Sequence, residues 1–144
     1  MAPSIAESLT CFARFWRNRR TVKDTETAAR FIFDSGKYAA TTGRARDRAF
    51  DQPELSVSLI DALPASTIWR LGDVAGEARK KPAAAYAWLP VAEWREIEMS
   101  IRCDEPPWRH AIADWPDTNL ERCKNLRQQL AAKARLVVRP IRPI

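Results

Sequence analysis

Two short segments in which apolar and polar side chains alternate constrain the fold more than any other feature of the sequence. They are Leu55–Ile60 (LSVSLI) and Ile97–Cys103 (IEMSIRC). Because successive side chains of a strand point to opposite faces, this alternation predicts half-buried β-strands. Shorter apolar runs predict further strands at Tyr86–Val91, Ala111–Ala113 and Leu136–Val138.

Segments with helical periodicity lie among the predicted strands but do not form regular strand–helix repeats. Apolar residues at helical spacing predict helices over Ser4–Arg17 and Thr25–Ser35. A further helix is expected to begin after Pro64. Gly72 and Gly76 weaken this prediction, because glycine is a poor helix former, and the helix ends either at Gly72 or later, before Pro82.

The clearest helical pattern lies near the C-terminus. Thr118 and Glu121 have the spacing of a capping box, in which two side chains bond the backbone N–H groups at the start of a helix. Apolar side chains then recur at helical spacing and predict a buried stripe. The stripe consists of Leu120, Cys123, Leu126, Leu130 and Ala134.

These elements predict an α+β fold, with a small, mostly antiparallel sheet packed with three to four helices. The length of 144 residues suits one domain. We expect that domain to span residues 1–138 and a Pro/Arg tail to follow at 139–144. The tail cannot lie inside a sheet, because its prolines lack a backbone N–H donor.

The three cysteines, Cys11, Cys103 and Cys123, are odd in number and form no closely spaced pair. This usage predicts free thiols in a reducing compartment. The sequence also has no apolar run long enough to cross a membrane and no signal-peptide pattern. We therefore expect a cytoplasmic protein that does not bind membranes.

The net charge of +6 is unevenly distributed along the chain. Residues 1–50 carry ten Lys and Arg against five Asp and Glu, and residues 119–144 carry seven against one. Residues 51–118 are acidic, with seven basic residues against twelve acidic ones. Either the basic ends form a surface for phosphates, or they neutralise the acidic middle within the fold. A third interpretation is that the acidic middle mimics a partner's ligand.

The segment Lys37–Phe50 has no periodicity and is predicted to be an extended loop. Its arginines occupy alternate positions, so in an extended chain they project to one side and can follow a phosphate backbone. Arginine also binds carboxylates of protein partners, so this pattern does not identify nucleic acid uniquely. The last predicted helix adds a second basic group. The predicted binding residues are Arg44, Arg46, Arg48, Arg122, Lys124 and Arg127.

We expect Arg44, Arg46 and Arg48 to lie exposed on the same side of the molecule as part of the Arg122–Arg127 face, and this basic surface to dock onto a larger protein complex or a nucleic-acid backbone. This predicts a non-enzymatic accessory protein. No helix-turn-helix, zinc-finger or RNA-recognition pattern accompanies the basic residues.

His110 is the only histidine of the chain, so a Ser–His–Asp or Cys–His site would have to use it. With Arg109 or Arg102 stabilising negative charge, His110 can act as a general acid or base on a phosphodiester or ribose. The alternative function is therefore a small nucleic-acid- or nucleotide-directed enzyme. A histidine bonded to the backbone of a turn explains the same residue without catalysis.

Cofactor and metal sites are not expected. The chain has four glycines and no glycine-rich phosphate loop, which excludes P-loop and dinucleotide-binding motifs. Cys103, His110 and Cys123 lack a fourth ligand and the spacing of structural zinc sites. Cys103 and Cys123 also fall on the apolar faces of their predicted elements, which favours the core.

Three short segments together resemble the layout of small bacterial proteins of unassigned function. They are Arg44–Phe50, Leu55–Ser58 (LSVS) and His110–Pro116 (HAIADWP), and the resemblance covers roughly residues 28–140. The resemblance implies that the protein is bacterial, and it assigns no activity to the protein.

Overall fold

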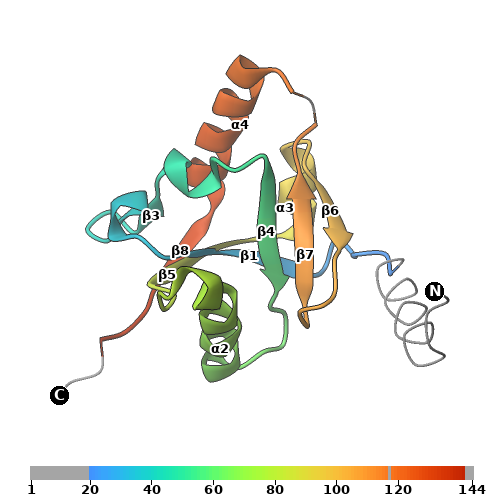
Figure 1. The fold of residues 1–144 in the computed structure, drawn as a ribbon. Coiled ribbons are helices and arrows are strands. Elements are labelled where there is room, and N and C mark those ends of the chain that lie inside the picture. The colour runs from blue at the N-terminus through green and yellow to red at the C-terminus, as the bar shows by residue number, and fades with distance from the viewer. Residues whose placement is uncertain (1–19, 117, 142–144) are drawn as a thin grey trace, which may run out of the picture.

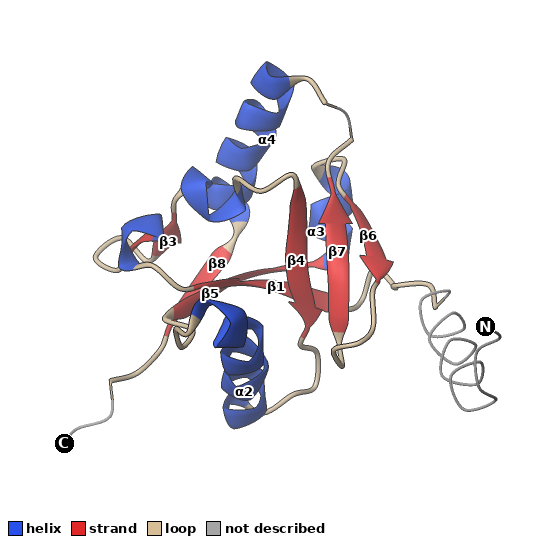
Figure 2. Ribbon diagram, viewed as in Figure 1, coloured by secondary structure: helices blue, strands red, loops and turns tan. Residues whose placement is uncertain are grey.

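The computed structural model describes residues 20–116 and 118–141, which form a six-stranded antiparallel sheet with helices on both faces (Figures 1 and 2). The strand order is β6-β7-β4-β1-β5-β8. This arrangement confirms an α+β fold with a mostly antiparallel sheet. The strands are β1 (Thr27–Ile32), β4 (Glu54–Leu59), β5 (Ala85–Pro90), β6 (Ser100–Cys103), β7 (His110–Asp114) and β8 (Arg135–Val138).

The sheet divides into two halves at the junction of β1 and β4. These strands pair only at Ala28–Leu59 and Ala29–Ser58, whereas β1 pairs with β5 along its whole length. In Figure 1, β1 and β5 run across the direction of β4 and β7. The two central strands therefore diverge beyond Ala29, and the next residue of β1, Arg30, lies where they separate.

Each face of the sheet has its own core. The larger core joins the sheet to α3 (Val91–Glu96) and α4 (Leu120–Lys133), and the smaller one joins it to α2 (Ala65–Gly76). Trp94 of α3 is the largest fully buried side chain. Its indole N–H donates to the Ala28 carbonyl at 3.4 Å, and its ring meets Phe50 edge to face.

The helix predicted over Thr25–Ser35 is wrong, because Thr27–Ile32 forms the central strand β1. All but the first residue of β1 are buried, since helices cover both faces of the sheet there. A strand buried on both faces has an apolar run without alternation. Such a short run cannot be distinguished from a helical face by periodicity. The helix predicted over Ser4–Arg17 lies outside the described residues.

The strand predicted over Ile97–Cys103 exists only from Ser100 onward. Ile97 instead ends α3, a short helix that was not predicted. The strands predicted around Leu55–Ile60, Tyr86–Val91, Ala111–Ala113 and Leu136–Val138 are confirmed within one or two residues at each end as β4, β5, β7 and β8.

The last helix, α4, is confirmed, but its predicted capping box is wrong. The N-cap is Asn119, whose side-chain oxygen accepts a hydrogen bond from the Arg122 backbone N–H at 3.0 Å. Leu120 is then the first helical residue and is 83 % exposed, so it does not belong to the buried stripe. The other four predicted stripe residues are buried.

The segment predicted as an extended loop, Lys37–Phe50, is largely folded. It contains a two-stranded sheet of β2 (Tyr38–Ala39) and β3 (Arg44–Ala45). The 3₁₀ turn η1 (Ser35–Lys37) precedes this small sheet, and η2 (Asp47–Phe50) follows it. Ala49 and Phe50 are buried in the larger core and anchor η2 there.

The helix predicted after Pro64 is α2, and it continues past Gly72 to Gly76. Both glycines lie where the helix meets other parts of the chain closely. A Cβ atom on Gly76 would lie 2.0 Å from the Lys81 carbonyl oxygen and 2.8 Å from the Phe33 ring. The close packing therefore requires glycine at positions 72 and 76, despite the low helix propensity of this residue.

Replacing Gly76 by alanine is expected to lower the free energy of unfolding by about 1–3 kcal/mol, because the backbone at Lys81 must move. Urea unfolding followed by circular dichroism measures the change. Gly36→Ala is the matched control, since a Cβ there meets no atom within 4 Å. Equal stabilities of the two variants would contradict the close approach of α2 to Lys81.

The chain after β8 is tied to α2. The Arg139 guanidinium contacts both carboxylate oxygens of Asp73, at 2.6 and 3.0 Å, and lies over the Trp69 ring. The hydrogen bonds from Arg139 lower the pKa of the Asp73 carboxyl below its usual value. Arg139, which was predicted to begin the tail, is therefore attached to the folded body.

Candidate functional site

The predicted basic segment lies beside α4. Arg44, Arg46 and Arg48 are all exposed: Arg44 lies on β3, Arg48 lies on η2, and Arg46 lies between these two elements. The Arg44 guanidinium donates to the Ala132 carbonyl at the end of α4, at 3.2 Å. The structure thus brings the segment next to the helix that carries the second predicted group.

The basic residues of α4 do not all lie on the side of η2. Arg127 borders a hollow together with Asp51 and Gln52, which directly follow η2. Arg122 forms an ion pair with Glu98 beyond the end of α3. Lys124 is exposed. The predicted set therefore separates, and Arg122 does not join the arginines of η2.

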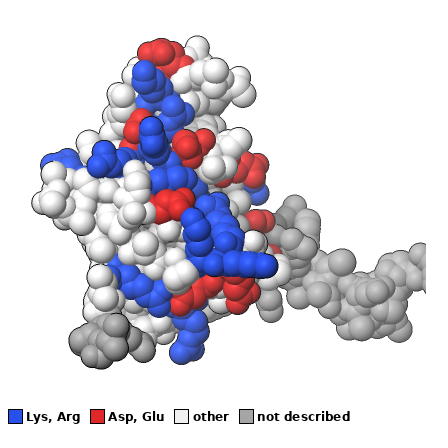
Figure 3. Space-filling model, turned by 60° about the vertical axis from the view of Figure 1, so that its left-hand side comes forward, with Lys and Arg blue, Asp and Glu red and all other residues white. Residues whose placement is uncertain are grey.

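Six of the fourteen described arginines form ion pairs with a carboxylate, and the arginines around η2 are not among them. Among the residues that the structure describes, Arg46, Arg48 and Arg127 have no acidic partner. Figure 3 shows Lys and Arg side chains extending down from α4, with Asp and Glu side chains between them. The ion pairs elsewhere are Arg20–Glu26, Arg95–Asp24, Arg102–Asp114, Arg122–Glu98, Arg135–Glu93 and Arg139–Asp73.

His110 begins β7 and is oriented by Asp104. Its Nδ1 lies 2.9 Å from the Asp104 backbone oxygen and 3.2 Å from the Asp104 carboxylate. Within residues 20–116 and 118–141, the other ring nitrogen, Nε2, has no hydrogen-bond partner. The backbone contact fits a structural histidine, and the added carboxylate is the partner that orients a histidine for proton transfer.

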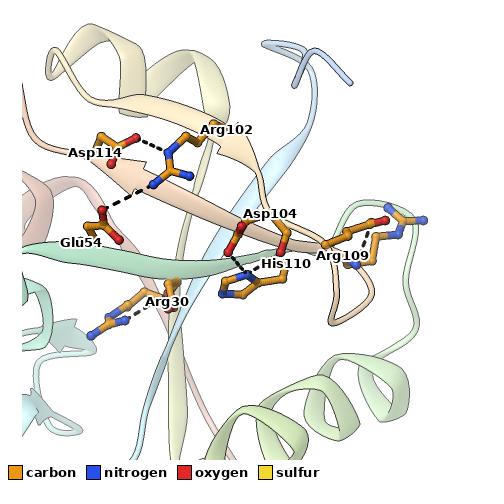
Figure 4. Close-up of polar contacts among 9 residues, drawn as sticks. Arg30, Glu54, Arg102, Asp104, Arg109, His110 and Asp114 are labelled. Carbon is orange, nitrogen blue, oxygen red and sulfur yellow. Dashed lines mark hydrogen bonds and ion pairs between the residues drawn. The ribbon is translucent and has the colours of Figure 1, made fainter. Parts of the chain in front are cut away.

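The two arginines predicted to assist His110 point elsewhere (Figure 4). Arg102 bonds Asp114 at 2.8 Å and also contacts Glu54, and the bond to Asp114 raises the pKa of Arg102. The Arg109 guanidinium lies over the ring of its neighbour Trp108, with 5.0 Å between them. The predicted trio of His110, Arg109 and Arg102 does not converge on one point.

Arg30 is the functional candidate that the sequence did not reveal. It is only 9 % exposed and fills the opening between the diverging strands β1 and β4. Its Nε donates to the Ala49 carbonyl at 3.0 Å, and its Nη1 donates to the Ser56 carbonyl at 3.1 Å. No described carboxylate pairs with it. Burial, together with the nearby charge of Arg79, lowers the pKa of Arg30 to about 10.

Arg30, Arg79 and His110 border the same pocket, which has a volume of about 260 Å³. The pocket lies between the sheet and the C-terminal end of α2. The sequence signal for this site was a lone arginine inside the apolar run of β1, which the incorrect helix assignment obscured. The remaining lining residues are Phe31, Phe33, Gln52, Glu54, Ser56, Val57, Ser58, Ala75 and Pro107.

Cys103 and Cys123 are buried and take part in no disulfide, and Cys11 lies outside the described residues. No group of three or more His, Cys, Asp or Glu in the described part of the chain is placed to hold a metal ion. Nor does any helix in that part have the length and apolarity needed to span a bilayer.

Comparison of the chain with protein-family models, curated proteins and solved structures gave no match. The placement of the side chains is therefore the basis for assigning a function.

Proposed function

We propose that the protein is a non-enzymatic accessory protein that binds a nucleic-acid backbone through the basic surface around η2 and α4. The observation that carries this proposal is that Arg46, Arg48 and Arg127, on or beside η2 and α4, all lack an acidic partner among the described residues, whereas six other arginines are paired with a carboxylate. We define the η2–α4 basic surface as Arg44, Arg46, Arg48, Lys124 and Arg127.

Exposed arginines without a carboxylate partner keep their hydrogen-bond donors available for phosphate oxygens. Binding a phosphate backbone also releases the counterions that surround it, which favours association at low salt. An acidic protein partner would use the same guanidinium groups. We favour nucleic acid because Arg44, Arg46 and Arg48 are separate, exposed cations, and a nucleic-acid backbone presents one phosphate per nucleotide to them. The Asp and Glu side chains that Figure 3 shows among the basic ones repel both kinds of partner, so they do not decide between them.

Replacing Arg44, Arg46 and Arg48 together by alanine is expected to weaken binding to a fluorescent oligonucleotide at least about tenfold at low salt. Single-stranded RNA and duplex DNA are both tested by fluorescence anisotropy. The stability of the variant should change little, because the three side chains are exposed and make only the Arg44–Ala132 hydrogen bond.

The matched control removes three positive charges elsewhere, from the exposed residues Lys23, Arg70 and Lys80. This control should bind nearly as tightly as the wild type. An equal loss of oligonucleotide affinity in both triple variants would show that binding depends on net charge alone. It would reject the η2–α4 basic surface as the binding site. Binding to an acidic protein but to neither nucleic acid would reject the proposal in favour of a protein partner.

The second candidate is a small nucleotide- or nucleic-acid-directed enzyme that uses His110. The specific observation in its favour is the double contact of His110 Nδ1 with Asp104, which leaves Nε2 free to exchange a proton. A His110→Ala variant tests it. Loss of hydrolysis of an oligonucleotide or nucleotide substrate, with binding retained, would support the enzyme and replace the first proposal.

A further inference from the structure

The pocket between the sheet and α2 has the features of an anion site and shares no residue with the η2–α4 basic surface. We propose that this pocket binds a phosphoryl group, through Arg30 and Arg79, with Ser58 and His110 completing the site. This inference goes beyond the proposed function, because it concerns a small ligand at a different part of the molecule.

Arg30, which borders the pocket, has an unused donor. Its Nε and Nη1 groups are bonded to backbone carbonyls, but its Nη2 group has no partner among the described residues. Every described side-chain nitrogen or oxygen that is shut off from solvent has a hydrogen-bond partner. Nη2 must therefore be open, and the pocket is the cavity that Arg30 borders. The two backbone bonds hold this donor in place before any ligand arrives.

Ser58 gives a second, independent observation. It is only 8 % exposed, and its hydroxyl has no hydrogen-bond partner in the described residues. Because every described side-chain oxygen that is shut off from solvent has a partner, the Ser58 hydroxyl must be open, and the pocket is the cavity that Ser58 borders. Ser58 lies directly opposite His110 in the β4–β7 ladder, so their side chains are neighbours on one face of the sheet. A nearly buried hydroxyl without a partner favours a polar ligand.

The charge around the pocket is mainly positive. Arg79 borders it from η3 (Glu77–Arg79), with its guanidinium 5.2 Å from the centre of the Phe33 ring. Three carboxylates lie nearby. Glu54 lines the pocket but contacts Arg102, Asp51 interacts with Arg30 from outside the lining, and Asp104 contacts Nδ1 of His110. None of the three forms an ion pair with Arg30 or Arg79, so the two positive charges remain available to an anion.

The size and donor set of the pocket favour a phosphoryl group over other anions. Its volume of about 260 Å³ lies just below the range for drug-sized ligands, about 300–1,000 Å³. A phosphoryl dianion can use both arginine charges and the Ser58 hydroxyl at once, whereas a carboxylate carries one charge. The phosphoryl group can belong to free phosphate or to a nucleoside monophosphate, and the experiment separates these two sources.

The single histidine supplies a direct probe of the site. Because the chain has one His, every imidazole signal in a proton–carbon NMR spectrum belongs to His110. We expect inorganic phosphate and adenosine 5′-monophosphate each to shift these signals saturably. Acetate at matched ionic strength should not. Equal affinity for the two phosphates would identify the phosphoryl group as the whole ligand, and tighter binding of the nucleotide would identify a nucleotide site.

Two variants test which residues bind the anion. Arg79→Ala should weaken phosphate binding about tenfold or more, and Ser58→Ala about threefold to tenfold, as expected for a charged and a neutral hydrogen bond. Arg79 is exposed, so its loss leaves the fold intact even if an Arg30 variant does not fold. Arg48→Ala, outside the pocket, is the control and should bind phosphate like the wild type.

The absence of a saturable shift in the wild type would overturn the proposal. So would wild-type affinity in both Arg79→Ala and Ser58→Ala, or an equal response to acetate. Loss of phosphate binding in Arg48→Ala would show that phosphate binds through general surface charge, and this result would also overturn the proposal. Because oligonucleotide binding is measured separately on the η2–α4 basic surface, the two proposals can fail independently.

Discussion

Replacing Trp94 by alanine is expected to lower the free energy of unfolding by about 3–5 kcal/mol. Trp94 is fully buried and connects α3 to the sheet through the hydrogen bond to Ala28. Its ring also packs against Phe50, which ends η2. The substitution leaves a cavity beneath both elements, and the structure around it relaxes only in part. Urea unfolding followed by tryptophan-independent far-ultraviolet circular dichroism measures the loss.

Trp108→Ala is the matched control for Trp94→Ala. Trp108 is 54 % exposed on the loop before β7, so its removal should change stability by less than about 1 kcal/mol. If the two tryptophan variants were equally stable, Trp94 would not occupy the centre of the larger core.

Leu130→Ala is expected to cost about 2–5 kcal/mol. Leu130 is fully buried in the larger core, where α4 packs against η2. Loss of this contact weakens the attachment of α4 to the segment that carries Arg44, Arg46 and Arg48. The same unfolding measurement applies, and the slope against urea concentration should remain that of the wild type.

The control for Leu130→Ala is the same substitution at Leu120, on the same helix. Leu120 is the first residue of α4 and is exposed, so Leu120→Ala should change stability by less than about 0.5 kcal/mol. A loss of stability in Leu120→Ala as large as that in Leu130→Ala would show that Leu120 is buried as part of the stripe. It would contradict the exposed position of Leu120 at the start of α4.

Two predicted elements owe their visible period to one buried and one solvated face. They are the first half of β4 and α4, where polar side chains mark the exposed face. β5 and β7 were predicted from short apolar runs instead, and most of their residues are buried on both faces. β1 is buried on both faces, so its pattern carries no period and was assigned to a helix. α3 is six residues long, too short for a helical period to appear.

The candidate sites were predictable to different degrees. Arg44, Arg46 and Arg48 were identified because exposed arginines at alternate positions form a local pattern. Arg30 was not, since its role depends on where β1 and β4 separate, which is a property of the tertiary structure. The orientation of His110 by Asp104 likewise depends on the turn between β6 and β7, which folds the chain back so that the two residues meet.

The salt dependence of nucleic-acid binding tests the proposed function most directly. The logarithm of the binding constant for duplex DNA falls with the logarithm of salt concentration, with a slope of about −0.9 per phosphate contact. We predict that the Arg44/Arg46/Arg48→Ala variant has a slope about two to three units shallower than the wild type, while the Lys23/Arg70/Lys80→Ala control keeps the wild-type slope. An unchanged slope in the first variant would show that these arginines do not contact phosphates, and would contradict the η2–α4 basic surface as the nucleic-acid site.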